Sequence, residues 1–134
     1  MTLLPSRPDR WETPFSEKEI SRLKIVHLFD DGDLVARVEW GQSSPECVWA
    51  RFQFKAPVVY RVLCDHADIG ESVAAFVGAG PTIRYTASSW LTDIRKATPN
   101  SDLIWPRLTH YIICTYDRRL EVICSDEPFL ELLT

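Results

Sequence analysis

Apolar and polar positions along most of the chain alternate with a period of two, which is typical of β-strands. An apolar run over residues 25–29 stops at the Asp-Asp-Gly-Asp segment of residues 30–33, and an alternating run follows over residues 34–40. An Asp-Gly pair between two such runs favours a tight turn, because glycine accepts the positive φ that the turn requires. The pattern therefore predicts a β-hairpin in this part of the chain.

A second hairpin is predicted near the C-terminus, with strands over residues 110–116 and 120–125 joined by a three-residue turn. In this register Cys114, Val122 and Cys124 share one face of the sheet. Cys114 then lies opposite Val122, so a disulfide between Cys114 and Cys124 is disfavoured. Further strands are expected at residues 48–54, 58–63 and 82–86.

Two segments follow the helical period instead. Ser16 and Glu19 have the spacing of a capping box and predict a helix of about two turns. Ser88 or Ser89 caps a second helix, whose apolar stripe contains Trp90, Leu91, Ile94 and Ala97. Residues 71–77 are expected to add one or two helical turns.

These elements predict an α+β fold, mainly an antiparallel β-sheet of about six to seven strands with two or three short helices packed on one face. The 134 residues fit a single domain, residues 1–134. Residues 1–14, which contain three prolines, are expected to form an irregular N-terminal arm with Trp11 as its anchor.

Composition narrows the classes of function. The net charge of −4 argues against a direct nucleic-acid binder, which usually carries a basic face. No run approaches the ~18 apolar residues needed to cross a membrane, and the first residues lack the apolar core of a signal peptide. We therefore expect a cytoplasmic protein whose four cysteines are reduced.

Candidate chemical sites are few. Cys64 and His66 would point the same way from a strand and could bind zinc, but no second ligand pair accompanies them. The glycines of residues 78–80 precede a strand rather than a helix, so they do not form a phosphate-binding loop. No nucleophile elbow is present. The sequence predicts no metal, no cofactor and no catalytic residue.

The last third of the chain carries a recognisable series of motifs. Ser88-Ser89-Trp90-Leu91 on a helix is followed by His110-Tyr111-Ile112, then Thr115-Tyr116-Asp117, then Leu120-Glu121-Val122-Ile123-Cys124. This series resembles small bacterial cytoplasmic proteins of the immunity-protein type. The resemblance implies a helix followed by a hairpin, and a role in neutralising a toxin. It implies no catalytic residue.

The leading hypothesis is a non-catalytic binding protein that neutralises a protein partner, as an immunity protein does a bacterial toxin. Acidic side chains steer association with a basic toxin or nuclease domain, and exposed aromatic residues among charges are typical of binding hot spots. The predicted charged rim consists of Asp65, Asp68, Glu71 and Glu121, and the predicted aromatic anchors are Trp49 and Trp105.

Three alternatives stay open at this point. The protein could be a small hydrolase or ligand-binding enzyme that uses His66 or His110 with a nearby carboxylate or cysteine. It could be a phage-encoded inhibitor of a host defence protein, which needs the same binding chemistry for a different target. The two tryptophans could also be covered by the N-terminal arm, in which case they would be structural.

Overall fold

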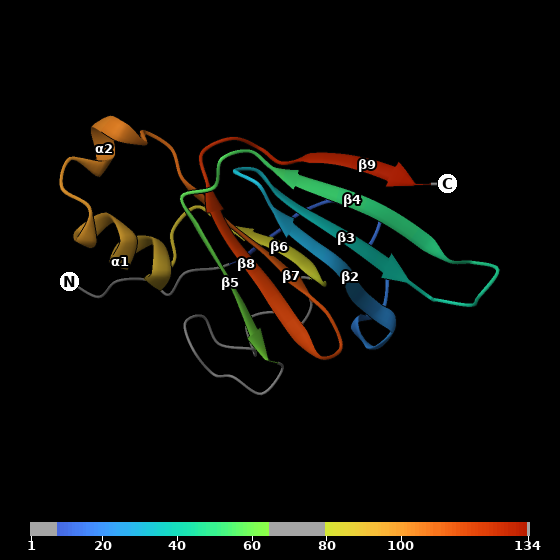
Figure 1. Cartoon of the computed structure of the whole chain (residues 1–134). Helices are drawn as coiled ribbons and strands as arrows, with labels where there is room; N and C mark the ends of the chain where they lie inside the picture. Colours follow the sequence, from blue (N-terminus) through green and yellow to red (C-terminus); the bar gives the residue numbers. More distant parts are fainter. Residues whose placement is uncertain (1–7, 65–79, 134) are drawn as a thin grey trace.

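The computed structural model describes residues 8–64 and 80–133 of the chain. These residues form two antiparallel β-sheets and two α-helices (Figure 1). The prediction of a mainly antiparallel fold with few helices is confirmed. The predicted count of six to seven strands is wrong, because nine strands form and they divide between two sheets. The two strands that the pattern missed, β1 and β9, are short and lie near the ends of the chain.

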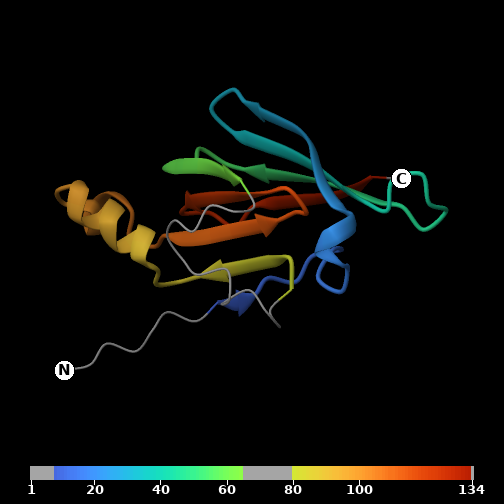
Figure 2. The ribbon, with the colours of Figure 1, turned by 90° about the horizontal axis from the view of Figure 1, so that it is seen from below.

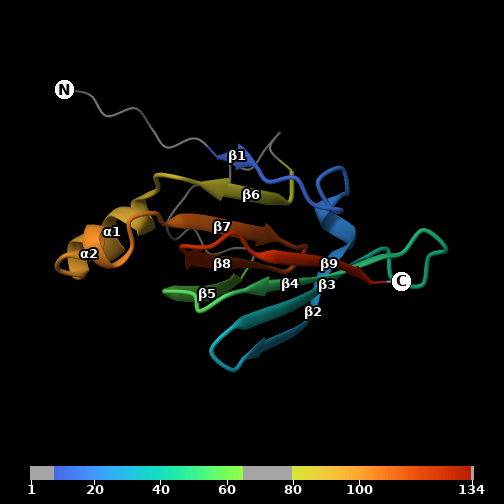
Figure 3. The same cartoon turned by 90° about the horizontal axis from the view of Figure 1, so that it is seen from above.

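One sheet has five strands in the order β1-β6-β7-β8-β5, and every neighbouring pair is antiparallel (Figure 3). Its strands are β1 (Asp9–Arg10), β5 (Val59–Cys64), β6 (Thr82–Tyr85), β7 (Thr109–Cys114) and β8 (Arg118–Cys124). The predicted N-terminal arm is thus not wholly irregular, since Asp9 and Arg10 pair with Arg84 and Ile83 at the sheet edge.

The other sheet has four strands in the order β2-β3-β4-β9, again all antiparallel. Its strands are β2 (Leu23–Asp30), β3 (Leu34–Trp40), β4 (Val48–Phe54) and β9 (Phe129–Leu133). The predicted hairpin between β2 and β3 is confirmed. Gly32 adopts a φ of 109°, and its N–H donates to the Asp30 carboxylate at 3.0 Å, which closes the turn.

The two sheets share one apolar core, into which each sheet turns one face. The four-stranded sheet contributes alternate side chains of β2, β3 and β4, and the five-stranded sheet contributes alternate side chains of β7 and β8. Trp11 joins the two layers, because its ring lies 5.3 Å from Phe52 on one side and 4.8 Å from Tyr111 on the other, measured between centroids. The predicted role of Trp11 as an anchor is confirmed by its burial.

The register of the β7–β8 hairpin differs from the prediction. Thr115 N–H donates to the Arg118 carbonyl at 2.8 Å, so the turn holds two residues rather than three. Cys114 therefore pairs with Arg119, and Tyr111 pairs with Val122. Because side chains alternate between faces, this odd shift exchanges the two faces of one strand relative to the other.

The helices form one group at an end of the five-stranded sheet (Figures 1 and 2). They are α1 (Ser89–Ala97) and α2 (Ser101–Ile104), and Ser88 caps α1 by accepting from the Leu91 N–H at 3.2 Å, as predicted. Leu91 packs against Ile123 on the face of the sheet that is turned away from the shared core. Neither described helix is long and apolar enough to cross a membrane.

The helix predicted to begin at Ser16 is wrong. Only the short 3₁₀ turn η1 (Ile20–Arg22) forms, and β2 begins at the next residue. The Ser16 hydroxyl does not cap a helix, because it donates to the Trp11 carbonyl at 3.0 Å and accepts from the Thr13 N–H at 2.8 Å. The helical turns predicted at residues 71–77 lie outside the described residues.

The role of Trp11 in joining the sheets can be tested by its removal. Trp11→Ala should lower the free energy of unfolding by about 3–5 kcal/mol, because it leaves a cavity between two packed layers. Urea unfolding followed by circular dichroism measures this change. The control is Leu103→Ala, at a side chain that is 82% exposed, which should change stability by less than about 0.5 kcal/mol. Equal effects of the two substitutions would contradict this account of the core.

Candidate functional site

A chain of buried polar side chains lies between α1 and the five-stranded sheet. The Ser88 Oγ lies 2.8 Å from Nδ1 of His110, and Nε2 of His110 lies 2.6 Å from Oε1 of Glu121. The other carboxylate oxygen, Oε2, accepts from Nε of Arg119 at 2.9 Å. Ser88, His110 and Glu121 are 2%, 0% and 1% exposed, respectively, so solvent barely reaches this chain.

The hairpin register brings these groups together. Ile112 pairs with Glu121 and His110 pairs with Ile123, so His110 and Glu121 are diagonal neighbours on one face. On the other side of β8, Arg61 of β5 is the cross-strand partner of Glu121 and reaches its Oε1 at 3.3 Å. The Arg61 guanidinium also lies 4.0 Å from the ring centroid of Trp90 in α1, a cation–π distance.

The surroundings of Glu121 determine which groups of this network carry protons. Burial by itself raises the pKa of Glu121, but the hydrogen bond and charge of His110, together with the charge of Arg61, lower the pKa below its usual value. Glu121 is therefore a carboxylate and can only accept, so Nε2 of His110 carries a proton. At the other side of the ring, Nδ1 of His110 shares a hydrogen bond with the Ser88 hydroxyl, and the Ser88 Oγ also accepts from the Leu91 N–H.

A serine, a histidine and a carboxylate in this order have the polarity of a hydrolase nucleophile and its base. Two observations favour a structural role instead. The Ser88 side chain is almost fully buried, and its oxygen caps α1. We interpret this network as structural, because it fixes α1 to the sheet. We call it the polar lock, and its members are Ser88, His110, Glu121 and Arg119.

A second candidate site is the face of the four-stranded sheet that points away from the shared core, which we call the open face. Cross-strand pairing arranges its side chains in three rows. The first row is Phe29, Val35, Gln53 and Phe129, the second is His27, Arg37, Arg51 and Glu131, and the third is Lys24, Glu39, Trp49 and Leu133. Within residues 8–64 and 80–133, no helix or strand lies over this face (Figures 1 and 2).

The open face is hollow and partly apolar. A depression of about 600 Å³ lies over its first two rows, with walls that include Phe29, Val35 and Leu133. Phe29 and Phe129, at the two ends of the first row, are 52% and 62% exposed. Arg37 lies 4.4 Å from the ring centroid of Trp49, and Arg51 pairs with Glu131 at 2.6 Å. Two phenylalanines, a tryptophan and two arginines therefore share this face.

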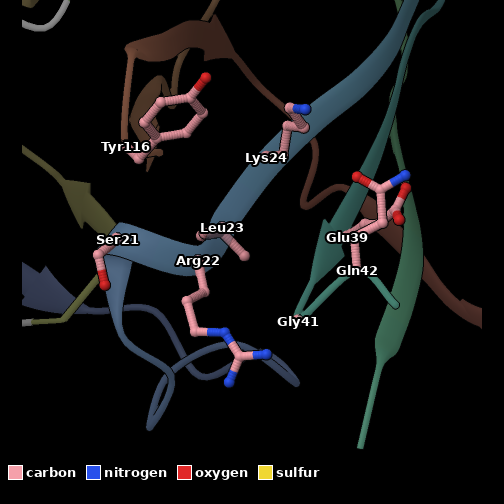
Figure 4. Close-up of a pocket in the computed structure, with 8 residues that line it drawn as sticks. All are labelled: Ser21, Arg22, Leu23, Lys24, Glu39, Gly41, Gln42 and Tyr116. Carbon is pink, nitrogen blue, oxygen red and sulfur yellow. The ribbon is translucent and has the colours of Figure 1, made fainter. Parts of the chain in front are cut away.

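A smaller pocket of about 220 Å³ lies beside the third row, between the start of β2 and the loop after β3 (Figure 4). Lys24, Glu39, Gln42 and Tyr116 are among the residues that line it. Glu39 is buried, and its Oε1 has no hydrogen-bond partner among the described residues. Lys24 is its cross-strand neighbour and is exposed.

The structure places the predicted site residues in different surroundings. Trp49 lies on the open face, whereas Trp105 packs against the cluster of Leu91 and Ile123, and its carbonyl accepts from Arg95 at 2.8 Å. The expectation that Glu121 lies on a charged rim is wrong, because its carboxylate is buried among His110, Arg61 and Arg119. The other predicted rim residues, Asp65, Asp68 and Glu71, lie outside the described residues, as does His66.

Sequence reasoning missed the remaining members of the open face. Arg37 and Arg51 lie in runs that were predicted only as strands, as does Phe29, and none of the three was predicted as a site residue. The signal that could have found them is the alternation itself. Once β3 and β4 are paired, their polar positions fall on one face and place the two arginines opposite each other.

The cysteines and candidate metal ligands show no assembled site. No disulfide joins the four cysteines, and burial raises the pKa of Cys124 to about 12, so its thiol is unreactive. Cys64 is exposed on β5. In the part of the chain that the structure describes, no group of three or more His, Cys, Asp or Glu side chains is placed to hold a metal ion.

The chain matches no protein-family model, no curated protein and no solved structure. The resemblance of residues 88–124 to proteins of the immunity type therefore stays a prediction from sequence. Function has to be argued from the geometry of the two candidate sites.

The polar lock makes a prediction about stability and pH. Glu121→Gln should lower the free energy of unfolding at pH 7 by roughly 3 kcal/mol or more, because it leaves buried cationic partners uncompensated. The folded-state pKa of Glu121 lies below the ordinary 4.5. The carboxylate therefore stabilises the fold above that pH, and this contribution is lost as the pH falls through the folded-state pKa.

Urea unfolding at pH 7, 5 and 3.5 tests this prediction, and the gap between the wild type and Glu121→Gln should narrow at the lowest pH. Glu131→Gln is the matched control, since its ion pair with Arg51 is solvent-exposed and should contribute less than about 1 kcal/mol. A gap that stays constant with pH would show that the charge of Glu121 is not what stabilises the fold.

Proposed function

We propose that this protein is a non-catalytic binding protein that neutralises a protein partner, as an immunity protein does a bacterial toxin, and that the open face is its binding surface. The observation that carries the proposal is the composition of that face. Two phenylalanines that are more than half exposed flank a hollow that also holds arginines.

The chemistry of the open face suits an interface with another protein. Aromatic residues and arginine are enriched at binding hot spots, where they fill pockets and exclude water. Phe29 and Phe129 lie on the two edge strands of the sheet, so a partner that contacts both must cover the whole width of the face. Trp49, on the inner strand β4, presents its ring to Arg37, and both residue types are enriched among hot spots.

The charge of the partner is a separate question. The sequence favoured a basic toxin because of four acidic residues, of which Glu121 is buried and the other three lie outside the described residues. The open face offers arginines in their place. The role as a neutralising protein therefore rests on the open face and not on an acidic rim.

The proposal is tested by capturing the partner and then removing the anchors. A tagged protein is purified from its native host, and a stoichiometric complex is identified by mass spectrometry and its mass on a sizing column. Phe29→Ala combined with Phe129→Ala should weaken that complex by about thirtyfold or more, because hot-spot truncations cost about 2 kcal/mol or more. Leu103→Ala, at an exposed leucine on α2, is the matched control and should bind as the wild type does.

Neutralisation needs its own measurement. The captured partner is expressed in a test cell with and without this protein, and survival is counted. Rescue by the wild type and by Leu103→Ala, but not by the double phenylalanine variant, is the expected result. A partner that remains fully active in the presence of this protein would overturn the proposal. Identification of a host defence protein as the target would select the phage-inhibitor alternative.

A second candidate, a small hydrolase, is favoured by one observation only, the order of Ser88, His110 and Glu121 in the polar lock. Its test is labelling with a fluorophosphonate probe, which reacts with activated serines. We expect no labelling, and we expect Ser88→Ala to cost about 1 kcal/mol of stability through loss of the α1 cap. Labelling that disappears in both Ser88→Ala and His110→Gln would favour the hydrolase.

A further inference from the structure

The second row of the open face places two arginines side by side, next to a histidine. His27 is the cross-strand partner of Arg37, and Arg37 is the cross-strand partner of Arg51. Like charges directly opposite each other on one face of a sheet are destabilising. The whole chain carries a net charge of −4, so this row is not the result of general basicity.

A carboxylate neutralises the positive charge of this row at one end only. Arg51 pairs with Glu131 of β9 at 2.6 Å. Arg37 stacks on Trp49, and no carboxylate of the described residues lies within ion-pair distance of its guanidinium. The ring of His27 lies 6.3 Å from that of Phe29, measured between centroids. A stacked guanidinium is held in place while its N–H groups still point outward, ready for an anion.

The nearby carboxylates do not form an ion pair with Arg37. Asp33 lines the same hollow, but its oxygens accept from the Ala56 N–H at 2.9 Å and from Nε2 of Gln53 at 3.0 Å. These two hydrogen bonds lower the pKa of Asp33 and hold its carboxylate at the end of the β2–β3 turn. Asp31 also lines the hollow and is exposed at that turn. The cationic row thus lies between an acidic turn and Glu131.

The hollow supplies an apolar wall next to the cations. Phe29, Val35 and Leu133 line it together with His27, Arg37 and Arg51. Its volume of about 600 Å³ is in the range of sites that bind side chains or small ligands. A ligand that fits must present a carboxylate to the arginines and an apolar group to the wall.

We infer that the cationic row of the open face binds an acidic segment of the partner protein, with a partner carboxylate between Arg37 and Arg51 and an adjacent apolar side chain against Phe29 and Leu133. This inference rests on the proposed function and names the chemistry of its partner. An arginine fork matches a carboxylate in bidentate geometry. A nucleic acid is disfavoured because the row is short and is flanked by acids that repel a continuous phosphate backbone.

The inference is tested with peptide probes and arginine resonances. The acetylated peptide Glu-Leu-Glu-Leu-Glu and its glutamine counterpart, Gln-Leu-Gln-Leu-Gln, are titrated into the full-length protein. The Nε–Hε signals of Arg37 and Arg51 are followed by NMR. The glutamate peptide should shift both signals and bind more weakly as salt is added. The glutamine peptide should leave them unchanged.

A pair of arginine variants separates this site from general charge. Arg37→Gln should weaken the glutamate peptide by about tenfold, which is the size expected for the loss of a charge-assisted hydrogen bond. Arg107→Gln, at an exposed arginine before β7, changes the net charge by the same amount and should bind as the wild type does. Both positions are exposed, so both variants should fold.

Three results would overturn the inference: equal binding of the two peptides, equal weakening by the two arginine variants, or binding of an oligothymidine but of neither peptide. Its failure is distinguishable from failure of the proposed function. A captured partner that Arg37→Gln still binds and neutralises, but the double phenylalanine variant does not, would refute the cationic row alone. A protein that neutralises no captured partner refutes the proposed function.

Discussion

The packing of one sheet against the other, with Trp11 between them, is the constraint on which the rest of the structure depends. Each sheet commits one face to the shared core, so each has one further face to cover or expose. The five-stranded sheet covers part of its second face with α1 and a buried ionic network. The four-stranded sheet has no described element over its second face, and the proposed binding surface rests on that difference.

Charged side chains lie in opposite surroundings on the two faces that are turned away from the shared core. Beneath α1, the carboxylate of Glu121 is surrounded by donors and removed from water, which favours a fixed arrangement over reactivity. On the open face, the charge of Arg37 stays in water and is supported only by a ring. Buried and satisfied polar groups specify a fold, whereas an exposed cation without a carboxylate partner is available to a ligand.

The sequence predicted the alternating strands, the turn at Gly32 and the cap at Ser88, because each depends on neighbouring residues. The prediction from sequence was wrong where a contact between residues that are not sequence neighbours determines the local structure. Ser16 turns back to the Trp11 carbonyl instead of capping a helix, and a turn shorter by one residue exchanged the faces of the second hairpin. Glu121 was expected at the surface because it is acidic, and its burial depends on contacts with His110 and Arg61, which are distant in the sequence. Trp49 could be proposed from its polar neighbours, but its partnership with Arg37 required the strand pairing.

The central claim is that the partner covers the open face, and hydroxyl-radical footprinting of the complex tests it most directly. Oxidation of Phe29 and Phe129 should fall strongly when the partner binds. Oxidation of Leu103 and Ile104, which are exposed on α2, should stay the same. Protection of Leu103 with unchanged oxidation of both phenylalanines would place the interface on the helices and contradict the account.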